Sequence, residues 1–329
     1  MPKSAPKGRK ITLDYIARHF ADEGEAYKFL EAQRWPNGPV CPHCRGTKAY
    51  FLQPRTPDRY TRTGHATQRR VWKCAACRRQ FSVLVGTIFE GSKIPLYKWL
   101  MAIHMMCMGK NGVSAHELHR ALEITYKSAW FMAHRIRKAM EREPLAGMLS
   151  GTVEADETYV GGKPRYKAPN RQEAARRREA TKVPVVSLVQ RGGEVRSRVM
   201  KRVTGENIAK LLKENVSQLS TLMTDSAHLY GKPGRSFKRH EIVDHGRGEY
   251  VRGEAYTNTV EGYFSQLKRS IDGTHHHVSE HHLNRYLAEF DFRYNTRKMQ
   301  DGERTLLAIR KAEGKRLRYR EPATEGAMP

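Results

Sequence analysis

The chain has 329 residues, enough for two or more domains that each bury a sizeable core. Lysine and arginine number 60 against 34 aspartates and glutamates, a formal net charge of +26 that calls for a polyanionic partner. No apolar run approaches the ~20 residues of a membrane span, and no hydrophobic segment follows the basic start as in a signal peptide. We therefore expect nucleic acid as the partner, no membrane, and a cytoplasmic protein.

The first segment, residues 1–35, is expected to hold a basic arm and one or two short helices. The arm is the sequence MPKSAPKGRK, and the helical pattern begins at about residue 13 and ends before RWPNGPVCPHC. The arm contains no apolar cluster that could fold by itself.

Two CxxC pairs follow within residues 36–90: Cys41 and Cys44 in CPHC, then Cys74 and Cys77 in CAAC. Two such turns present the four thiolates of a tetrahedral zinc shell. The 29 residues between the pairs exceed the usual spacing of roughly 15–20, and the surplus is a basic stretch that fits a long ribbon finger. Redox chemistry at one CxxC would need no second pair. We predict one structural zinc ion within a ribbon of short strands.

Residues 91–148 are expected to be helical and to contain a helix-turn-helix. Ser114 and Glu117 have the spacing of a capping box at the start of its first helix. The second helix carries basic residues around an apolar set, and we predict that these bind DNA: Lys127, Arg135, Arg137 and Lys138. A plain helical hairpin is the alternative, which the net charge and the adjacent ribbon disfavour.

Strand-like and helical segments share residues 149–310, which we expect to form the catalytic domain. The helix GENIAKLLKENV lies between two of the strands. The polar and basic stretch 165–182 is interpreted as a mobile insertion between strands. Residues 311–329 form a basic tail that is poor in core residues.

Acidic residues stand at three places in that domain. Glu154, Asp156 and Thr158 alternate along one strand and share one face, Asp225 ends another strand, and Glu261 opens a helix. A single acid of this kind is more often a turn or cap residue. Three in the order strand, strand, helix can hold two divalent ions roughly 4 Å apart, an arrangement suited to in-line displacement at phosphorus. Mg²⁺, or Mn²⁺ in its place, prefers such carboxylates together with water and substrate phosphates.

The helix predicted over residues 257–271 has a basic residue in line with its acid. Glu261 and Lys268 are seven residues apart, so two turns place them nearly in line on one edge, beside the buried stripe. A helix packed on a sheet can aim side chains of that edge across the end of the sheet. A pair that is merely solvated is the alternative.

These motifs together resemble a bacterial insertion-sequence transposase of the DDE class, in the subgroup with an N-terminal zinc ribbon and helix-turn-helix. The likeness runs from RWPNGPVCPHC through EADETYVGG and TDSAHLYG to TNTVEGYFSQLKR and EFDFRYNTR. It implies an α/β RNase H-like core with a mixed sheet, and Asp156, Asp225 and Glu261 as magnesium ligands. The 35 residues between Asp225 and Glu261 match the class. Lys268 matches the basic residue that follows the third acid in this class. The resemblance also leaves Asn258 as a helper to Glu261 or as its substitute at the third metal position.

The resemblance also implies how the protein would act. It would bind the terminal inverted repeats of its own element, cut the 3′ ends with water and join them to target DNA, as a homodimer or higher oligomer associated with the bacterial nucleoid. Glu289, Arg293 and Arg297 form an i, i+4, i+8 row, and the two arginines would support the active site or DNA, unless the row is only a set of stabilising ion pairs. A non-catalytic DNA-binding regulator and a nuclease without strand joining are the alternatives.

Overall fold

The computed structural model describes most of the chain in seven stretches, residues 11–20, 22–53, 70–143, 147–161, 182–225, 228–244 and 251–319. The chain divides into two compact units, one of Met1–Met140 with Met299–Pro329 and one of Glu141–Lys298. The expected basic arm lies outside the described residues, and so does the expected insertion 165–182 apart from Lys182. Within the described stretches, no helix has both the length and the apolar character needed to cross a membrane.

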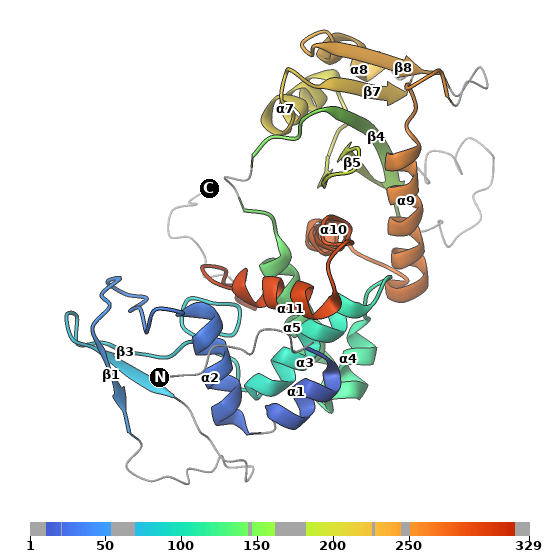
Figure 1. The fold of residues 1–329 in the computed structure, drawn as a ribbon. Coiled ribbons are helices and arrows are strands. Elements are labelled where there is room, and N and C mark those ends of the chain that lie inside the picture. The colour runs from blue at the N-terminus through green and yellow to red at the C-terminus, as the bar shows by residue number, and fades with distance from the viewer. Residues whose placement is uncertain are drawn as a thin grey trace, which may run out of the picture. The chain divides into compact units, whose positions relative to one another are not determined.

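The first unit contains a small antiparallel sheet in the order β1-β2-β3. Its strands are β1 (Ala49–Leu52), β2 (Val71–Cys74) and β3 (Gln80–Phe81). Strands β1 and β3 are labelled in Figure 1. β1 pairs with β2 from Ala49↔Cys74 to Leu52↔Val71, which brings the second CxxC turn beside the base of β1. The ribbon of short strands expected within residues 36–90 is therefore confirmed.

Helices make up the rest of this unit: α1 (Leu13–His19), α2 (Glu23–Arg34), α3 (Leu96–Met108), α4 (Ala115–Leu122), α5 (Tyr126–Met140) and α11 (Asp301–Arg310). α3 is apolar on most sides and is largely buried, as a central helix should be. The cap of α4 is the predicted capping box of Ser114 and Glu117. Glu123 ends α4 with a left-handed φ of 49°, and this tight turn leads directly into α5 as a helix-turn-helix.

The last helix, α11, belongs to this first unit. The sequence had predicted a catalytic domain that extends to residue 310 and would include this helix. α11 packs against α3, where His104 Nδ1 and Thr305 Oγ1 lie 2.9 Å apart inside the core. Arg304 also donates to the carbonyl oxygen of Cys107 at 2.7 Å. The second unit thus ends at Lys298, because the buried side chains of α11 pair with the N-terminal helices. The periodic pattern of a helix does not show which domain it will join.

The second unit is built on a mixed sheet in the order β6-β5-β4-β7-β8. Its strands are β4 (Thr152–Val160), β5 (Val183–Gln190), β6 (Val195–Val199), β7 (Thr221–Asp225) and β8 (Arg239–Val243). β4, β5 and β6 are antiparallel, while β7 and β8 run parallel to β4. This mixed sheet confirms the expected RNase H-like α/β fold.

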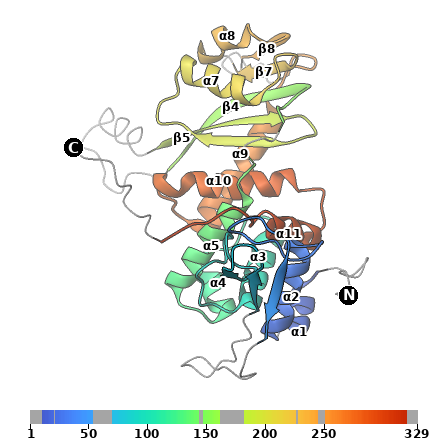
Figure 2. The ribbon, with the colours of Figure 1, turned by 90° about the vertical axis from the view of Figure 1, so that its left-hand side faces the viewer.

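Helices cover both faces of the sheet. α7 (Gly205–Asn215) and α8 (His228–Gly234) contribute Leu211 and Tyr230 to a core beneath Val153 and Ala155 of β4. α9 (Asn258–Ser270), the π-helical turn η2 (Ile271–His275) and α10 (Glu280–Asn295) form the opposite core with Val160. Figures 1 and 2 show α9 beside β4, as the contacts between these elements require.

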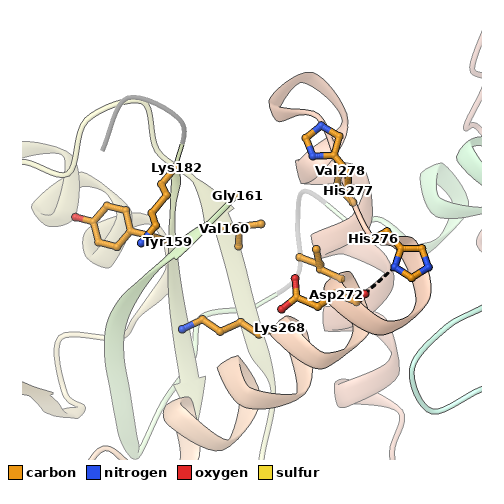
Figure 3. A pocket seen from close by; sticks show the side chains of 10 residues that line it. Tyr159, Val160, Gly161, Lys182, Lys268, Asp272, His276, His277 and Val278 are labelled. Carbon is orange, nitrogen blue, oxygen red and sulfur yellow. Dashed lines mark hydrogen bonds between the residues drawn. The ribbon is translucent and has the colours of Figure 1, made fainter. Parts of the chain in front are cut away.

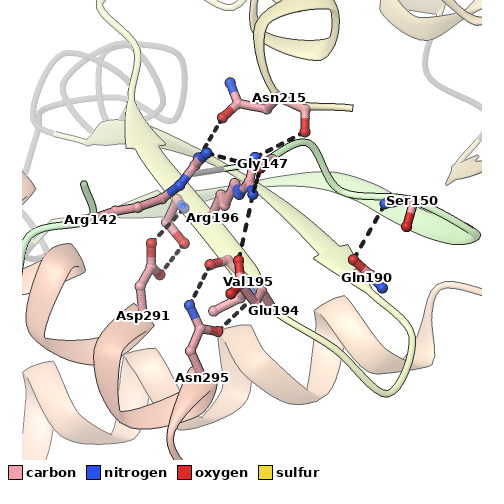
Figure 4. Close-up of polar contacts among 11 residues, drawn as sticks. Arg142, Gly147, Ser150, Gln190, Glu194, Val195, Arg196, Asn215, Asp291 and Asn295 are labelled. Carbon is pink, nitrogen blue, oxygen red and sulfur yellow. Dashed lines mark hydrogen bonds and ion pairs between the residues drawn. The ribbon is translucent and has the colours of Figure 1, made fainter. Parts of the chain in front are cut away.

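The edge strand β6 is closed by side chains of α10 (Figure 4). Each of three α10 residues accepts one backbone amide hydrogen of β6: Asn284 from Val199 at 3.1 Å, Asp291 from Ser197 at 2.7 Å and Asn295 from Val195 at 2.7 Å. Burial raises the pKa of Asp291 to about 6, although hydrogen bonds donated to its carboxylate act in the opposite direction. These contacts satisfy groups that an open strand edge would expose to another chain.

Candidate active site and zinc site

The four predicted zinc ligands are gathered in one place. Sγ of Cys41 lies 3.6 Å from Sγ of Cys77, and Sγ of Cys44 lies 3.5 Å from Sγ of Cys74. All four sulfur atoms lie within 4.8 Å of one another. Zinc–sulfur bonds of about 2.3 Å in a tetrahedron separate the sulfurs by about 3.8 Å. The group therefore fits one zinc ion with no coordination position left for chemistry.

The two knuckles have the same local conformation. Arg45 follows the first pair with φ 63°, and Arg78 follows the second with φ 60°. Their amides donate to the carbonyl oxygens of Cys41 at 2.9 Å and Cys74 at 3.1 Å. Each turn is thus closed by its own backbone, which is why the CxxC spacing alone predicted this site.

The acids on the sheet come from neighbouring parallel strands. β4 and β7 are in register at Ala155↔Thr224, so Asp156 and Asp225 stand side by side one residue further along. Adjacent strands lie about 4.8 Å apart. Ala155 packs towards α7 and α8, so the alternation of the strand turns Asp156 to the face of α9. The same alternation along β7 places Asp225 on that face.

The third acid reaches this place from α9, which packs on β4. Glu261 lies in the first turn of α9, and its Oε1 accepts a hydrogen bond from Oγ1 of Thr257 at 3.0 Å. Asn258, the other candidate for the third position, is the first residue of the helix and is exposed.

The pKa of Asp156 reflects its burial and the acids near it. Burial raises the pKa of Asp156 to about 7, and repulsion from Asp225, Glu157 and Glu261 acts in the same direction. One backbone amide, that of Glu157 at 2.7 Å, opposes the shift. Asp156 thus lies beside three other acids, and a divalent cation bound there would offset the repulsion among them.

The carboxylate oxygens of the three acids are not close enough together to bind one ion jointly. Among the residues that the structure describes, the four cysteines form the one group of three or more His, Cys, Asp or Glu side chains able to ligate one ion together. Asp156, Asp225 and Glu261 are not in such a group, although Asp225 and Glu261 lie near enough to Asp156 to raise its pKa.

Two further acids of β4 have partners that the sequence did not reveal. Glu157 faces the opposite side of the sheet, where the buried Tyr230 hydroxyl donates to its Oε2 at 2.8 Å. Glu154 shares the face of Asp156 but is fully buried and forms an ion pair with Arg191, whose Nε lies 2.7 Å from its Oε1. The alternation of β4 indicated these faces, but the partners are distant in sequence.

Lys268 lies on the exposed side of α9, two turns beyond Glu261, and lines a cavity of about 540 Å³. Figure 3 shows Tyr159 and Lys182 at one side of the cavity and Lys268 and Asp272 at the other. The cavity lies where β4 ends and β5 begins, along the C-terminal half of α9. Two amines facing one space suit an anionic group such as a DNA phosphate.

The predicted DNA-binding residues of α5 fall into two groups. Lys127 is exposed, with its Nζ 5.2 Å from the ring centre of Tyr319, and Lys138 is half-buried. Arg135 and Arg137 are buried, which contradicts the prediction that they contact DNA. The guanidinium of Arg135 donates to the carbonyl oxygen of Glu90 and lies 5.4 Å from the ring centre of Trp99, inside the unit's own core.

The two arginines predicted to support the active site or DNA also differ: Arg293 lies in α10, and Arg297 follows its C-terminal end. Arg293 is buried and pairs with Glu289 one turn earlier, so it matches the alternative of a stabilising ion pair. Arg297 is exposed, although its Nη1 donates to the carbonyl oxygens of Gly193 at 3.0 Å and Tyr294 at 2.7 Å. Arg297 remains the one of the pair that DNA could reach.

A zinc ribbon and helix-turn-helix in one unit, with an RNase H-like mixed sheet in the other, are the architecture of a transposase of the DDE class. Comparisons with known proteins agree. The model of the ISXO2-like transposase domain matches residues 148–295, and that of the transposase zinc-ribbon domain matches residues 21–80. A relative from Halobacterium salinarum, named as an uncharacterized protein in transposable element ISH50, is 30% identical over 287 residues, covering 83% of this chain and 91% of that protein. The chain belongs to the ISXO2-like family of transposases with an N-terminal zinc ribbon.

Proposed function

We propose that the protein binds the terminal inverted repeats of its own insertion sequence, hydrolyses the 3′ ends and joins them to target DNA. The observation that carries this proposal is the position of Asp156 and Asp225, each one residue beyond the last paired residues of the parallel strands β4 and β7 and near Glu261 in the first turn of α9. The relative in a transposable element and the matched transposase domain support it.

Asp156, Asp225 and Glu261 would hold two Mg²⁺ or Mn²⁺ ions, with Asn258 beside them as a helper. Bound there, such ions activate an attacking oxygen and stabilise a leaving one at phosphorus. Burial raises the pKa of Asp156 to about 7, and a divalent ion bound there would favour the ionised carboxylate that serves as a ligand.

Other residues bind and orient the DNA. Lys268 would contact a backbone phosphate next to the acids, as a compact charge on a flexible stem. In the first unit, the exposed Lys127 and the half-buried Lys138 are the α5 residues in reach of the element end. We assign end recognition to residues ~1–145, which contain the ribbon and helix-turn-helix. We assign catalysis to the second unit.

The partners and location follow from the same proposal. Both ends of an element must be held together for joining, so we propose a homodimer or higher oligomer on DNA. The substrate places the working protein in the cytoplasm with the nucleoid, in keeping with the net charge of +26.

Electrophoresis of a labelled element end tests the proposal. Purified protein with Mg²⁺ should nick the end at its 3′ terminus and then transfer it to a target plasmid, while binding alone should not need Mg²⁺. Nicking without transfer would identify a nuclease, and binding without nicking would identify a DNA-binding regulator; either result would contradict the proposal.

A further inference from the structure

The first turn of α9 lacks the cap that a helix usually provides for itself. The opening amides of a helix have no partner within it and are commonly capped by the preceding side chain. Thr257 stands at that position but makes no side-chain cap hydrogen bond. Its hydroxyl donates to Glu261 instead.

Glu154 of β4 takes over this role from a distance of 105 residues along the chain. Its Oε2 accepts the backbone amides of Thr259 at 2.8 Å and Val260 at 3.0 Å, and its Oε1 accepts the hydroxyl of Thr259 at 2.8 Å. A carboxylate at a helix N-terminus also complements the positive end of the helix dipole. Glu154 therefore fastens the first turn of α9 to the centre of the sheet.

Arg191 completes the attachment from the turn after β5. Its Nε donates to Oε1 of Glu154 at 2.7 Å, Nη1 to the carbonyl oxygen of Glu254 at 2.9 Å and Nη2 to that of Tyr256 at 2.8 Å. The guanidinium also stacks on Tyr256, 3.5 Å from the ring centre. One side chain thus neutralises the buried carboxylate and holds the segment that leads into α9.

The contacts of Glu154 lie next to both Asp156 and Glu261, two of the proposed metal ligands. Glu154 is two residues before Asp156 on the same face of β4, and Thr259 and Val260 come directly before Glu261. Fixing these amides to Glu154 fixes the distance from Asp156 to Glu261. Glu154 is fully buried, so it is not exposed to the solvent from which metal ions would bind the other acids.

We infer that Glu154 and Arg191 are positioning residues that hold the first turn of α9 so that Glu261 can share divalent ions with Asp156 and Asp225. The inference rests on the proposed function, because it assumes that Glu261 is a ligand. Partners that orient metal ligands are typically worth 10–100-fold in metal affinity.

The test compares four variants of the full-length, zinc-loaded protein. Glu154→Gln keeps the shape but replaces one acceptor oxygen with an amide donor, which must face either the helix amides or Arg191. Arg191→Lys keeps the charge but loses the planar fork. Glu261→Gln removes the proposed ligand itself. Glu157→Gln is the matched control, since it changes the same strand on the opposite face and retains an acceptor for Tyr230.

Two measurements separate positioning from general folding. Hydrogen exchange without divalent ions should be at least about tenfold faster at the amides of Thr259 and Val260 in Glu154→Gln. Mn²⁺ titration followed by electron paramagnetic resonance should show half-saturation raised about tenfold in Glu154→Gln and less in Arg191→Lys. Excess Mn²⁺ should restore cleavage in Glu154→Gln but not in Glu261→Gln, and the control should match the wild type in both measurements.

The outcomes distinguish this inference from the proposed function. Wild-type Mn²⁺ affinity in Glu154→Gln, with weakened affinity in Glu261→Gln, would overturn the positioning role alone. Unchanged exchange at Thr259 and Val260 would overturn it as well. Wild-type Mn²⁺ affinity in Glu261→Gln would contradict the proposed ligand set and, with it, the inference.

Discussion

The zinc site and the acid site differ in how their ligands are brought together. The cysteines come from two turns that the backbone closes locally, and their sulfurs already lie 3.5 to 3.6 Å apart in pairs. The acids come from β4, β7 and α9, and only tertiary packing makes them neighbours. A local site can be identified from spacing, whereas a site of this second kind depends on the fold and on the residues that hold its elements in place.

Loss of one zinc ligand should have the largest effect. Cys74→Ser removes a thiolate from the four-sulfur group, and we expect release of zinc and unfolding of the ribbon, because structural zinc binding supplies folding energy. Zinc content by atomic absorption and circular dichroism would measure both. Cys107→Ser is the matched control: it changes a buried cysteine outside the group and should keep the zinc. Wild-type protein without zinc would refute the site.

Lys268→Ala should come next, because it tests whether the exposed edge of α9 serves DNA. We expect cleavage of the element end to fall by roughly tenfold or more with the fold retained, while Lys268→Arg keeps partial activity since it retains the charge. Lys298→Ala changes another exposed lysine and should act as the wild type. A solvated lysine without a role would cost a few tenths of a kcal/mol in stability and nothing in activity, so normal transposition in Lys268→Ala would support that alternative.

The raised pKa of Asp156 predicts a pH-dependent stability. The folded protein keeps this proton to a pH of about 7, whereas the unfolded chain releases it near 3.8. Without divalent ions, the ionised carboxyl therefore costs stability that increases as the pH rises from about 4 to about 7. Asp156→Asn removes this cost.

Thermal unfolding of the two proteins at several pH values measures the difference. Asp156→Asn should equal the wild type near pH 4 and exceed it at pH 8. The full shift corresponds to roughly 4 kcal/mol, and screening by solvent at this half-buried side chain reduces it to on the order of 1–2 kcal/mol. Mg²⁺ should narrow the gap by stabilising the wild type. A constant gap from pH 4 to pH 8 would show that Asp156 does not titrate in this range.

The smallest effect concerns the exposed and the buried basic residues of α5. Lys127→Ala should weaken binding of an element end by roughly three- to tenfold, reduce the salt dependence of binding by about one ion, and leave stability unchanged. Arg135→Ala should instead lower the melting temperature, because the side chain is buried against Trp99 and Glu90. Fluorescence anisotropy and thermal unfolding measure the two quantities. A large loss of DNA affinity in folded Arg135→Ala would support the sequence-based prediction that Arg135 contacts DNA.

The sequence predicted the parts of this molecule that depend on local patterns. The CxxC turns, the capping box of Ser114 and the alternation that puts Asp156 on one face of β4 all follow from spacing. Burial of Arg135 and the packing of α11 did not follow, because an amphipathic helix shows which residues are apolar but not which other helix will cover its charges. The partners of Glu154 were hidden for the same reason, since they lie 37 residues or more away.

The acid site is tested most directly by two variants of neighbouring residues on β4. Asp156→Asn and Glu157→Gln each remove one carboxylate, on opposite faces of the strand. With a labelled element end and Mg²⁺, we expect Asp156→Asn to bind the DNA with nearly wild-type affinity and to produce no nicked or joined product, while Glu157→Gln produces both. Nicking by Asp156→Asn at the wild-type rate would contradict the proposal that this face of the sheet carries out the reaction.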